Sequence, residues 1–326
     1  MRRAAITAVG GYLPERSLTN ADLEKLVDTS DEWIVERTGI RERRILPRGK
    51  GTGHMATMAA QEALAKRGIS AEEIDLLIVA TVTPDHPFPA TANTVAAQLG
   101  ARKAWGFDLE AACSGFLYAL SIAADSIAVG RVDKALVIGS DKMSSIIDYR
   151  DRATCVIFGD GAGAVLLEPT EEEVGIMDYL HQADGKGCAF LHMKGGGSLL
   201  PASIRTVRNR LHYVYQEGRQ VFKHAINQMA EISEALMRKN GLTPADIAFF
   251  VPHQANRRII EAVAQRLGFP LEKVMINIDR YGNTTAGTIP LCLYDYEKQL
   301  KKGDNLILST FGGGFTWGAL WLRWAY

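Results

Sequence analysis

Three side chains suited to acyl chemistry lie at points where the sequence changes character. Cys113 lies in LEAACSGF, His253 in VPHQAN and Asn283 in YGNTTAG. A cysteine thiolate is a nucleophile, while a neutral histidine N–H and an asparagine amide can donate hydrogen bonds to an oxygen that gains negative charge. Together they could form a covalent thioester and stabilise an enolate made from another thioester.

Each of the three also has an ordinary structural interpretation. Cys113 could be an inert buried cysteine, His253 a hydrogen-bonded group at a strand end, and Asn283 a turn residue after glycine. The segment 114–130 is apolar on nearly all sides, which predicts a buried helix that begins beside the cysteine. We expect the unpaired N–H groups and the dipole at that helix start to favour the thiolate of Cys113.

The elements that must position these residues repeat along the chain. Three pairs of segments match in the same order and at nearly constant separation: 62–80 with 235–253, 95–100 with 263–268, and 134–140 with 304–310. The first pair predicts a helix closed by glycine, a Ser/Thr cap with an acidic third residue, and a strand. The sequence therefore predicts a duplication into two similar halves, residues 1–172 and 173–326.

Strand-like runs alternate with amphipathic helical runs, which indicates a layered α/β fold. We expect a pseudo-twofold axis with the two sheets side by side. At the repeat distance Cys113 corresponds to Asn283, and His253 follows a strand. Because ligand-binding groups gather where strands end and helices begin, the axis would bring Cys113 and Asn283 to facing sides of one cleft, with His253 on its rim.

Composition narrows the function classes. Lys plus Arg and Asp plus Glu both number 37 in 326 residues, so we expect neither nucleic acid nor an anionic membrane as a partner. No apolar run approaches the roughly 20 residues that span a bilayer, and the N-terminus does not resemble a signal peptide, which predicts a cytoplasmic location. The four cysteines lie far apart, so we expect reduced thiols.

No cofactor is expected. His181, Cys188 and His192 could be strung together as metal ligands, but a fourth ligand is missing, so we expect no metal. The segment GDGAGA, residues 159–164, lies between two strand-like runs and predicts a turn between strands. It is not the strand-to-helix phosphate loop of a nucleotide site, so no nicotinamide or ATP is implied.

Taken together, the motifs resemble those of a known family. The chain resembles β-ketoacyl-acyl-carrier-protein synthase III, the family that initiates bacterial type II fatty acid synthesis. The motifs that carry the resemblance occur in that family's order and spacing: TSDEWIVERTGIRERR, AACSGF, DRATCVIFGDGAGA, VPHQAN, DRYGNTTAG and FGGGFTWG. These motifs cover both halves. The resemblance implies a thiolase-like fold, layered α/β/α/β/α, and an acyltransferase that condenses acyl-CoA with malonyl-acyl carrier protein.

The resemblance also implies a role for each central residue. Cys113 would attack acyl-CoA, and malonyl-acyl carrier protein would then lose carbon dioxide to give an enolate that attacks the acyl group. His253 and Asn283 would stabilise the enolate, while the backbone N–H groups of Cys113 and Gly313 would form the oxyanion hole. The product would be 3-oxoacyl-acyl carrier protein.

Binding residues follow from the same resemblance. Trp33 and Arg152 would sandwich the adenine of CoA, since an indole face and a guanidinium plane both stack on a base. The other residues expected near CoA are Thr29, Arg37 and Asn256. Phe88 and Ile157 would line the acyl pocket, with Phe88 reaching into the partner subunit of a homodimer.

Carrier protein is acidic, so its docking surface should be basic. Arg257, Arg258 and Arg266 lie just after the histidine motif on a predicted helix. Such a run usually just faces solvent, but at the mouth of a substrate tunnel it would attract an anionic partner.

Two departures from the family pattern leave the primer open. Gly287 stands where alanine is usual, which would add backbone freedom beside Asn283 and could alter the acyl pocket. The amino-acid sequence of the segment Glu217–Phe222 also differs from the one that is usual in the family.

Other proteins of the same fold make different demands. Hydroxymethylglutaryl-CoA synthase would need a catalytic glutamate, a degradative thiolase a second catalytic cysteine, and a noncatalytic subunit would lack the nucleophile; none of these patterns is present. The main alternative is a related condensing enzyme of secondary metabolism whose acceptor is not a carrier protein.

Overall fold

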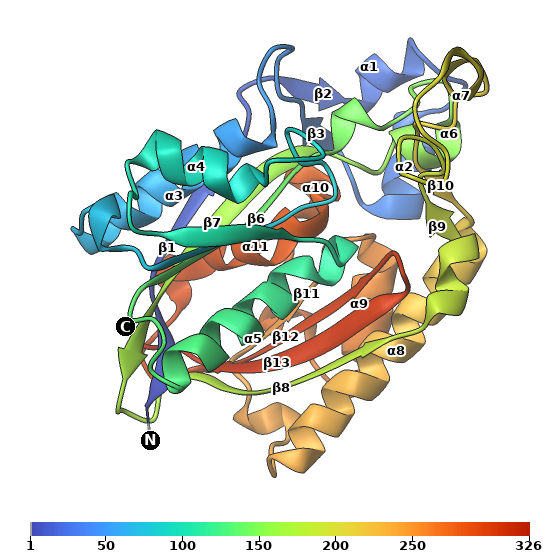
Figure 1. The fold of residues 1–326 in the computed structure, drawn as a ribbon. Helices are drawn as coiled ribbons and strands as arrows, with labels where there is room; N and C mark the ends of the chain where they lie inside the picture. The colour runs from blue at the N-terminus through green and yellow to red at the C-terminus, as the bar shows by residue number, and fades with distance from the viewer. Residues whose placement is uncertain (1) are drawn as a thin grey trace.

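The computed structural model describes residues 2–326, which form two large β-sheets interleaved with helices and two small two-stranded sheets (Figure 1). The first half holds a five-stranded sheet in the order β1, β7, β6, β4, β5, and the second a four-stranded sheet in the order β8, β13, β12, β11. These strands are β1 (Arg3–Tyr12), β4 (Leu76–Ala80), β5 (Trp105–Leu109), β6 (Ala135–Lys142), β7 (Asp160–Thr170), β8 (Gly175–Ala183), β11 (Phe249–Pro252), β12 (Asn305–Gly312) and β13 (Thr316–Arg323).

The two sheets repeat the same pairing directions. β1, β7 and β6 pair antiparallel and β6 pairs parallel with β4, just as β8, β13 and β12 pair antiparallel and β12 pairs parallel with β11. β5 extends the first sheet, whereas its counterpart is reduced to a bridge between Phe250 and Val274. The duplicated α/β architecture predicted from the sequence is confirmed, and the division at residue 172, between β7 and β8, stays a prediction.

Helices form three layers around the two sheets (Figure 1). α3 and α4 cover the outer face of the first sheet, α8 with α9 packed on it covers the outer face of the second, and α5 and α11 lie between the sheets. Buried apolar side chains fill each interface. The bounds are α3 (Thr52–Arg67), α4 (Thr91–Leu99), α5 (Gly115–Ala128), α8 (Gly218–Lys239), α9 (Arg257–Leu267) and α11 (Thr288–Tyr296).

Shorter elements gather mostly at one end of the molecule, where α1, α2, α6 and α7 lie near one another in Figure 1. They are β2 (Ser17–Thr19), α1 (Asn20–Glu24), α2 (Asp31–Thr38), β3 (Glu42–Arg44), α6 (Arg152–Cys155), β9 (Leu191–His192), α7 (Ile204–Arg208), β10 (Tyr215–Gln216) and α10 (Ile278–Tyr281). The 3-10 helices are η1 (Ala71–Glu73), η2 (Ala112–Ser114), η3 (Met143–Ser145), η4 (Gly185–Ala189), η5 (Pro244–Asp246), η6 (Leu271–Lys273), η7 (Thr285–Gly287) and η8 (Glu297–Gln299). Within residues 2–326, every helix is too short or too polar to cross a membrane.

Local signals set the ends of the repeated elements as predicted. α3, α4 and α9 each end at a left-handed glycine: Gly68, Gly100 and Gly268. Both predicted capping boxes form, Ser70 with Glu73 and Thr243 with Asp246. The two halves therefore build their helix-to-strand units in the same way.

The prediction that GDGAGA is a turn is wrong, because residues 160–170 form the buried strand β7. Its glycines allow α11 to approach the sheet closely. A Cβ on Gly163 would lie 2.6 Å from Cβ of Pro290, and one on Gly139 in β6 would collide with the carbonyl of Ala286. Because these two strand positions are glycines with no side chain, the segment after Asn283 can lie directly on the first sheet.

A buried arginine holds the segment that carries α2. Arg43 in β3 is fully buried and donates two hydrogen bonds of 2.9 Å to Oδ1 of Asn20, and one to the carbonyl of Val156. Burial lowers the pKa of Arg43 to about 10, so the side chain stays charged at neutral pH. Asn20 also donates to Asp31 at the start of α2. The neutral Asn20 amide therefore has two roles: it solvates the buried Arg43 cation and it fixes the start of α2.

Replacing Asn20 tests this arrangement. Asn20→Ala would leave Arg43 without its main acceptor, so we expect the free energy of unfolding to fall by about 3 kcal/mol. Urea unfolding followed by circular dichroism measures the change. The exposed Asn209→Ala is the matched control, with an expected change within about 0.5 kcal/mol. Equal effects of the two substitutions would contradict the assignment.

Candidate active site

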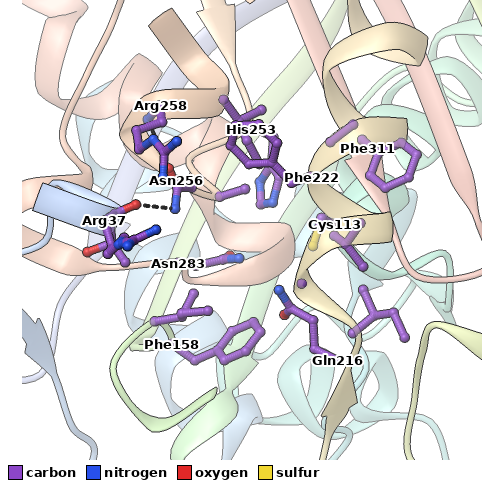
Figure 2. Close-up of a pocket in the computed structure, with 18 of the residues that line it drawn as sticks. Arg37, Cys113, Phe158, Gln216, Phe222, His253, Asn256, Arg258, Asn283 and Phe311 are labelled. Carbon is purple, nitrogen blue, oxygen red and sulfur yellow. Dashed lines mark hydrogen bonds between the residues drawn. The ribbon is translucent and has the colours of Figure 1, made fainter. Parts of the chain in front are cut away.

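Cys113, His253 and Asn283 line one cavity of about 470 Å³ (Figure 2). Cys113 belongs to the turn before α5 in the first half, while His253 follows β11 and Asn283 precedes η7 in the second. Figure 2 shows the three side chains facing the same space. Residues from the rest of the wall include Trp33, Arg37, Ile157, Phe222, Asn256, Arg258, Phe311 and Gly312. The structure thus brings together the residues that the repeat predicted to converge.

A strained turn presents Cys113 to this cavity. Ala112, which precedes it, has a φ of 47°, in the left-handed region that is uncommon for residues other than glycine. η2 then leads directly into α5. A Cβ on Gly312 would lie 2.6 Å from the backbone nitrogen of Cys113, so the end of β12 packs tightly on the turn. Cys113 is only 7% exposed, and its side chain is reached through the cavity.

The thiol of Cys113 is neutral in the resting chain. Burial raises the pKa of Cys113 well above its ordinary value, and the carboxylate of Asp141 raises it further. Asp141 is itself buried and accepts hydrogen bonds from Thr81 Oγ1 and from the backbone of Val82 and Ala286. The expectation that the helix start favours the thiolate is wrong for the resting state, because desolvation outweighs the dipole. The thiol therefore needs a base.

His253 enters the cavity as a neutral imidazole. The residue is 1% exposed, and burial lowers its pKa to about 3. Its backbone N–H donates to the carbonyl of Ser309 at 2.8 Å, which fixes it beside β12. Nδ1 lies 2.7 Å from Oγ1 of Thr288. Nε2 is therefore the ring nitrogen that remains for a ligand.

Hydrogen bonds also fix the direction of the Asn283 amide. Oδ1 accepts from the backbone N–H of Thr285 at 2.8 Å, and the backbone N–H of Asn283 donates to Ile157 at 2.9 Å. No residue among 2–326 accepts a hydrogen bond from Nδ2 of Asn283. The two Nδ2 hydrogens are therefore left to donate to an oxygen in the cavity.

Gly313 lies beside the turn that carries Cys113 but does not itself line the cavity. A Cβ on Gly313 would lie 3.6 Å from Cβ of Ala112. Its carbonyl accepts from Thr316 Oγ1 at 3.1 Å, which fixes the orientation of the glycine loop. The predicted oxyanion-hole partners are thus neighbours in space.

The residues expected to bind CoA lie around the mouth of the cavity. Trp33, Arg37 and Asn256 line it, whereas Thr29 and Arg152 lie outside its wall. Asn256 Nδ2 donates to the carbonyl of Arg37 at 2.8 Å, which links α9 to α2 (Figure 2). The Arg152 guanidinium lies 4.6 Å from the centre of the Trp33 ring. The guanidinium lies over the ring, so an adenine would have to separate the two groups.

The three arginines expected to bind carrier protein differ in their contacts. Arg257 pairs with Glu261 at 2.8 Å, and Arg266 pairs with Glu231 at 3.1 Å. Arg258 instead lines the cavity, with its guanidinium 5.4 Å from the centre of the Phe222 ring. Arg258 is the one whose charge faces the substrate entrance.

The residues proposed and rejected as metal ligands have other contacts. His181 stacks on Tyr179 with ring centres 5.0 Å apart, and Cys188 Sγ donates to the carbonyl of Gly314 at 3.0 Å. Across residues 2–326, no group of three or more His, Cys, Asp or Glu side chains is arranged to hold a metal ion. All four cysteines are free thiols.

The sequence did not predict one wall of the cavity. The start of α8 contributes Gly218, Arg219, Val221 and Phe222, and Gln216 precedes them. The amino-acid sequence of this segment departs from the family pattern. That departure was the one sequence signal that could have marked it as part of the site.

Gly287 has a different role from the one expected. It does not line the cavity, and its φ of −73° is ordinary helical backbone. A Cβ there would lie 3.1 Å from the carbonyl oxygen of Gly161. The structure shows that the glycine gives room for close packing on β7, and its effect on the acyl pocket stays a prediction.

The raised pKa of Cys113 predicts slow alkylation near neutral pH. Because the thiolate is the reactive form, the rate of Cys113 alkylation by iodoacetamide should keep rising through pH 9. Asp141→Asn removes a carboxylate that raises this pKa, so alkylation at pH 8 should accelerate, by about tenfold per pKa unit.

Peptide mapping by mass spectrometry gives the rate at Cys113. A Cys188→Ser background removes the exposed thiol, and a thermal melt checks that Asp141→Asn stays folded. An alkylation rate that levels off below pH 8 would show that Cys113 is already a thiolate.

Comparison with known proteins agrees with this geometry. Residues 107–185 match the family model described as 3-oxoacyl-[acyl-carrier-protein (ACP)] synthase III, and residues 237–324 match the C-terminal model of the same family. A beta-ketoacyl-[acyl-carrier-protein] synthase III of Phocaeicola vulgatus is 56% identical over 324 residues, which are 99% of this chain and 97% of the relative. One from Koribacter versatilis is 55% identical and covers 100% of this chain and 99% of its own.

Solved structures agree as well. The crystal structure of 3-oxoacyl-[acyl-carrier-protein] synthase III from Aquifex aeolicus has a TM-score of 0.91 at 45% identity, covering 98% of this chain and 100% of that chain. The Thermus thermophilus structure has a TM-score of 0.92 at 43% identity, covering 98% of this chain and 99% of that chain. This chain therefore belongs to the β-ketoacyl-acyl-carrier-protein synthase III family, acyltransferases that are condensing enzymes with the thiolase fold.

Proposed function

We propose that this cavity performs the first condensation of type II fatty acid synthesis. An acyl-CoA primer and malonyl-acyl carrier protein would give 3-oxoacyl-acyl carrier protein, CoA and carbon dioxide. The observation that carries the proposal is the convergence of a thiol, a neutral imidazole and an amide donor at one cavity. Full-length similarity to synthases of this type supports it and does not favour the alternative, a condensing enzyme of secondary metabolism with another acceptor.

In the first half-reaction Cys113 Sγ attacks the thioester carbonyl of acyl-CoA. The carbonyl oxygen gains negative charge and accepts hydrogen bonds from the backbone N–H groups of Cys113 and Gly313. The bond to the CoA sulfur then breaks, CoA leaves as a thiol, and the acyl group stays on Cys113. The close packing of the end of β12 on the Cys113 turn places Gly313 beside that turn, which is the observation behind this assignment.

In the second half-reaction malonyl-acyl carrier protein takes the place of CoA. Its bond to the carboxylate breaks, carbon dioxide leaves, and the electron pair forms an enolate. The enolate oxygen accepts hydrogen bonds from Asn283 Nδ2 and His253. The free direction of the Nδ2 hydrogens supports the role of Asn283. The enolate carbon attacks the acyl group, and the Cys113 sulfur leaves.

CoA would enter between α2 and α9. Arg37 and Asn256 line the mouth and are positioned to meet its polar groups, with Thr29 nearby on the same segment as α2. The Trp33 and Arg152 planes would take the adenine between them after separating.

We also infer a homodimer in which Phe88 reaches the partner subunit. The Phe88 side chain is 85% exposed, which is unusual for a residue of this size and polarity. β5 lies at the edge of the first sheet, where Trp105 is 55% exposed, so a second subunit could extend the sheet there. Phe88 would then close the partner's acyl pocket near Ile157. Four free thiols fit a reducing cytoplasm, where we expect this dimer to work.

Intact-mass spectrometry with acetyl-, isobutyryl- and hexanoyl-CoA tests the proposed reaction. We expect an acyl adduct on Cys113 that disappears into 3-oxoacyl-acyl carrier protein when malonyl-acyl carrier protein is added. Cys113→Ala should lose the adduct, while Cys188→Ala, which changes an exposed thiol, should keep it. An adduct that ignores malonyl-acyl carrier protein would support the alternative acyltransferase, and a Cys113→Ala enzyme with normal turnover would refute the mechanism.

Charge reversal at Arg258 tests the docking surface. Arg258→Glu should raise KM for malonyl-acyl carrier protein by about tenfold or more at low salt, because the unpaired charge lies at the entrance. Arg266→Glu is the control, with a smaller expected effect because Arg266 is already paired with Glu231. Steady-state kinetics at two salt concentrations separates attraction from packing. Equal effects of the two reversals would place docking elsewhere.

A further inference from the structure

Thr288 stands directly behind His253, and nothing in the proposed reaction yet uses it. It is the first residue of α11 and is 2% exposed. Its Oγ1 lies 2.7 Å from Nδ1 of His253 and 3.1 Å from the carbonyl oxygen of Thr285. One hydroxyl therefore makes two buried contacts, and the position of its single hydrogen decides the state of the histidine.

The two contacts together assign that hydrogen. A carbonyl oxygen only accepts, so the contact with Thr285 is a hydrogen bond only if the hydroxyl of Thr288 donates to it. The same oxygen must then accept from Nδ1 of His253, which carries the ring hydrogen. In the opposite arrangement the two oxygens would lie 3.1 Å apart with no hydrogen between them, and the Thr285 carbonyl would keep only the backbone N–H of Thr288 as a donor.

We propose that Thr288 is a positioning residue that keeps the hydrogen of neutral His253 on Nδ1 and so directs the Nε2 lone pair into the cavity. This reverses the polarity expected from the sequence, where the neutral ring was an N–H donor. The proposal rests on the proposed role of His253 in the condensation.

This tautomer supplies the base that the acylation step lacks. Burial and Asp141 keep Cys113 a neutral thiol, and the low pKa of His253 keeps Nε2 unprotonated at neutral pH. The Sγ proton of Cys113 passes to Nε2 as the sulfur attacks the acyl-CoA carbonyl. When the carbon–sulfur bond to CoA breaks, the CoA sulfur takes that proton from Nε2. His253 then returns to its starting state.

The decarboxylation step uses the same nitrogen with a proton on it. The overall condensation consumes one proton, because a malonyl carboxylate becomes neutral carbon dioxide. That proton enters from solvent at Nε2 when the anionic malonyl group arrives and raises the pKa of the ring. Nε2–H donates to the enolate oxygen, and after carbon–carbon bond formation the departing Cys113 sulfur takes the proton. Nδ1 stays protonated and bound to Thr288 throughout.

Two substitutions of Thr288 separate its hydroxyl from its volume. Thr288→Val keeps the shape but removes the acceptor for Nδ1–H, so the neutral ring should move its hydrogen to Nε2. Thr288→Ser restores the hydroxyl and should restore the tautomer. Neither Cys113 nor Asn283 is hydrogen-bonded to the Thr288 hydroxyl, so we expect the nucleophile and the amide donor to stay in place in both variants.

Nitrogen NMR reads the tautomer without any substrate. In enzyme labelled with ¹⁵N at its seven histidines, the His253 signals are those missing from His253→Gln. We expect a protonated Nδ1 and an unprotonated Nε2 in the parent and in Thr288→Ser, and the reverse in Thr288→Val. A parent enzyme with the hydrogen on Nε2 overturns the proposal.

The two half-reactions give a second readout. With the acyl-CoA that labels the parent fastest, Thr288→Val should slow acyl transfer to Cys113 by about a hundredfold, the lower range for general acid–base catalysis. Release of carbon dioxide from malonyl-acyl carrier protein should fall by less than about tenfold, since Nε2–H is still present. Thr288→Ser should approach the parent in both.

The outcomes separate this proposal from the one on which it rests. Equal losses in both half-reactions of Thr288→Val, with the tautomer unchanged, would mean that Thr288 is only structural. A His253→Gln enzyme that condenses at the parent rate would remove the proposed role of His253, whatever the tautomer of the ring.

Discussion

The active site depends on a backbone-to-backbone contact between Gly139 in β6 and Ala286 in η7. Any side chain at Gly139 would collide with the carbonyl of Ala286, so only glycine lets the two halves touch there. Asp141, two residues further along β6, accepts the N–H of Ala286 and fixes the contact. Asn283 and Thr288 lie on either side of η7. The hydrogen bond that orients the Asn283 amide and the one that orients the His253 ring are therefore both made by residues next to this contact. A nucleophile from one half is thereby held at a fixed separation from donors of the other.

Burial decides the charge of the groups around this contact. Cys113 and His253 are each nearly inaccessible to solvent, and both are neutral because the charged forms would lose their hydration. Asp141 keeps part of its charge through its several hydrogen bonds, although burial raises its pKa to about 6. The thiol and the imidazole are therefore uncharged before substrate binds, and the charges that must be stabilised are those of the substrates. The Asn283 amide and the backbone N–H groups are fixed donors that can stabilise these charges without reorganising, whereas His253 must first gain a proton on Nε2.

The sequence could predict the fold and the central residues because both follow from signals that recur. The repeated helix, cap and strand place Cys113 opposite Asn283 at a fixed separation, and the structure has that topology. Features that arise from distant contacts could not be predicted. GDGAGA resembles a turn until α11 is seen against β7. The pKa of Cys113 depends on the burial of its thiol and on Asp141, which comes from a distant strand. The only sequence signal for the cavity wall at the start of α8 was that its residues differ from the family pattern.

The stacked pair of Trp33 and Arg152 bears on how fast the enzyme can turn over. In the free chain the Arg152 guanidinium already lies over the Trp33 ring, so an adenine that entered between them would replace one favourable contact with two. Part of the stacking energy would therefore be absent from the affinity for the proposed nucleotide. When such a nucleotide left, the two side chains could meet again and recover their contact, which would lower the cost of release. Weaker retention of CoA at this pair would favour its exchange for the proposed second substrate, malonyl-acyl carrier protein, which carries no purine.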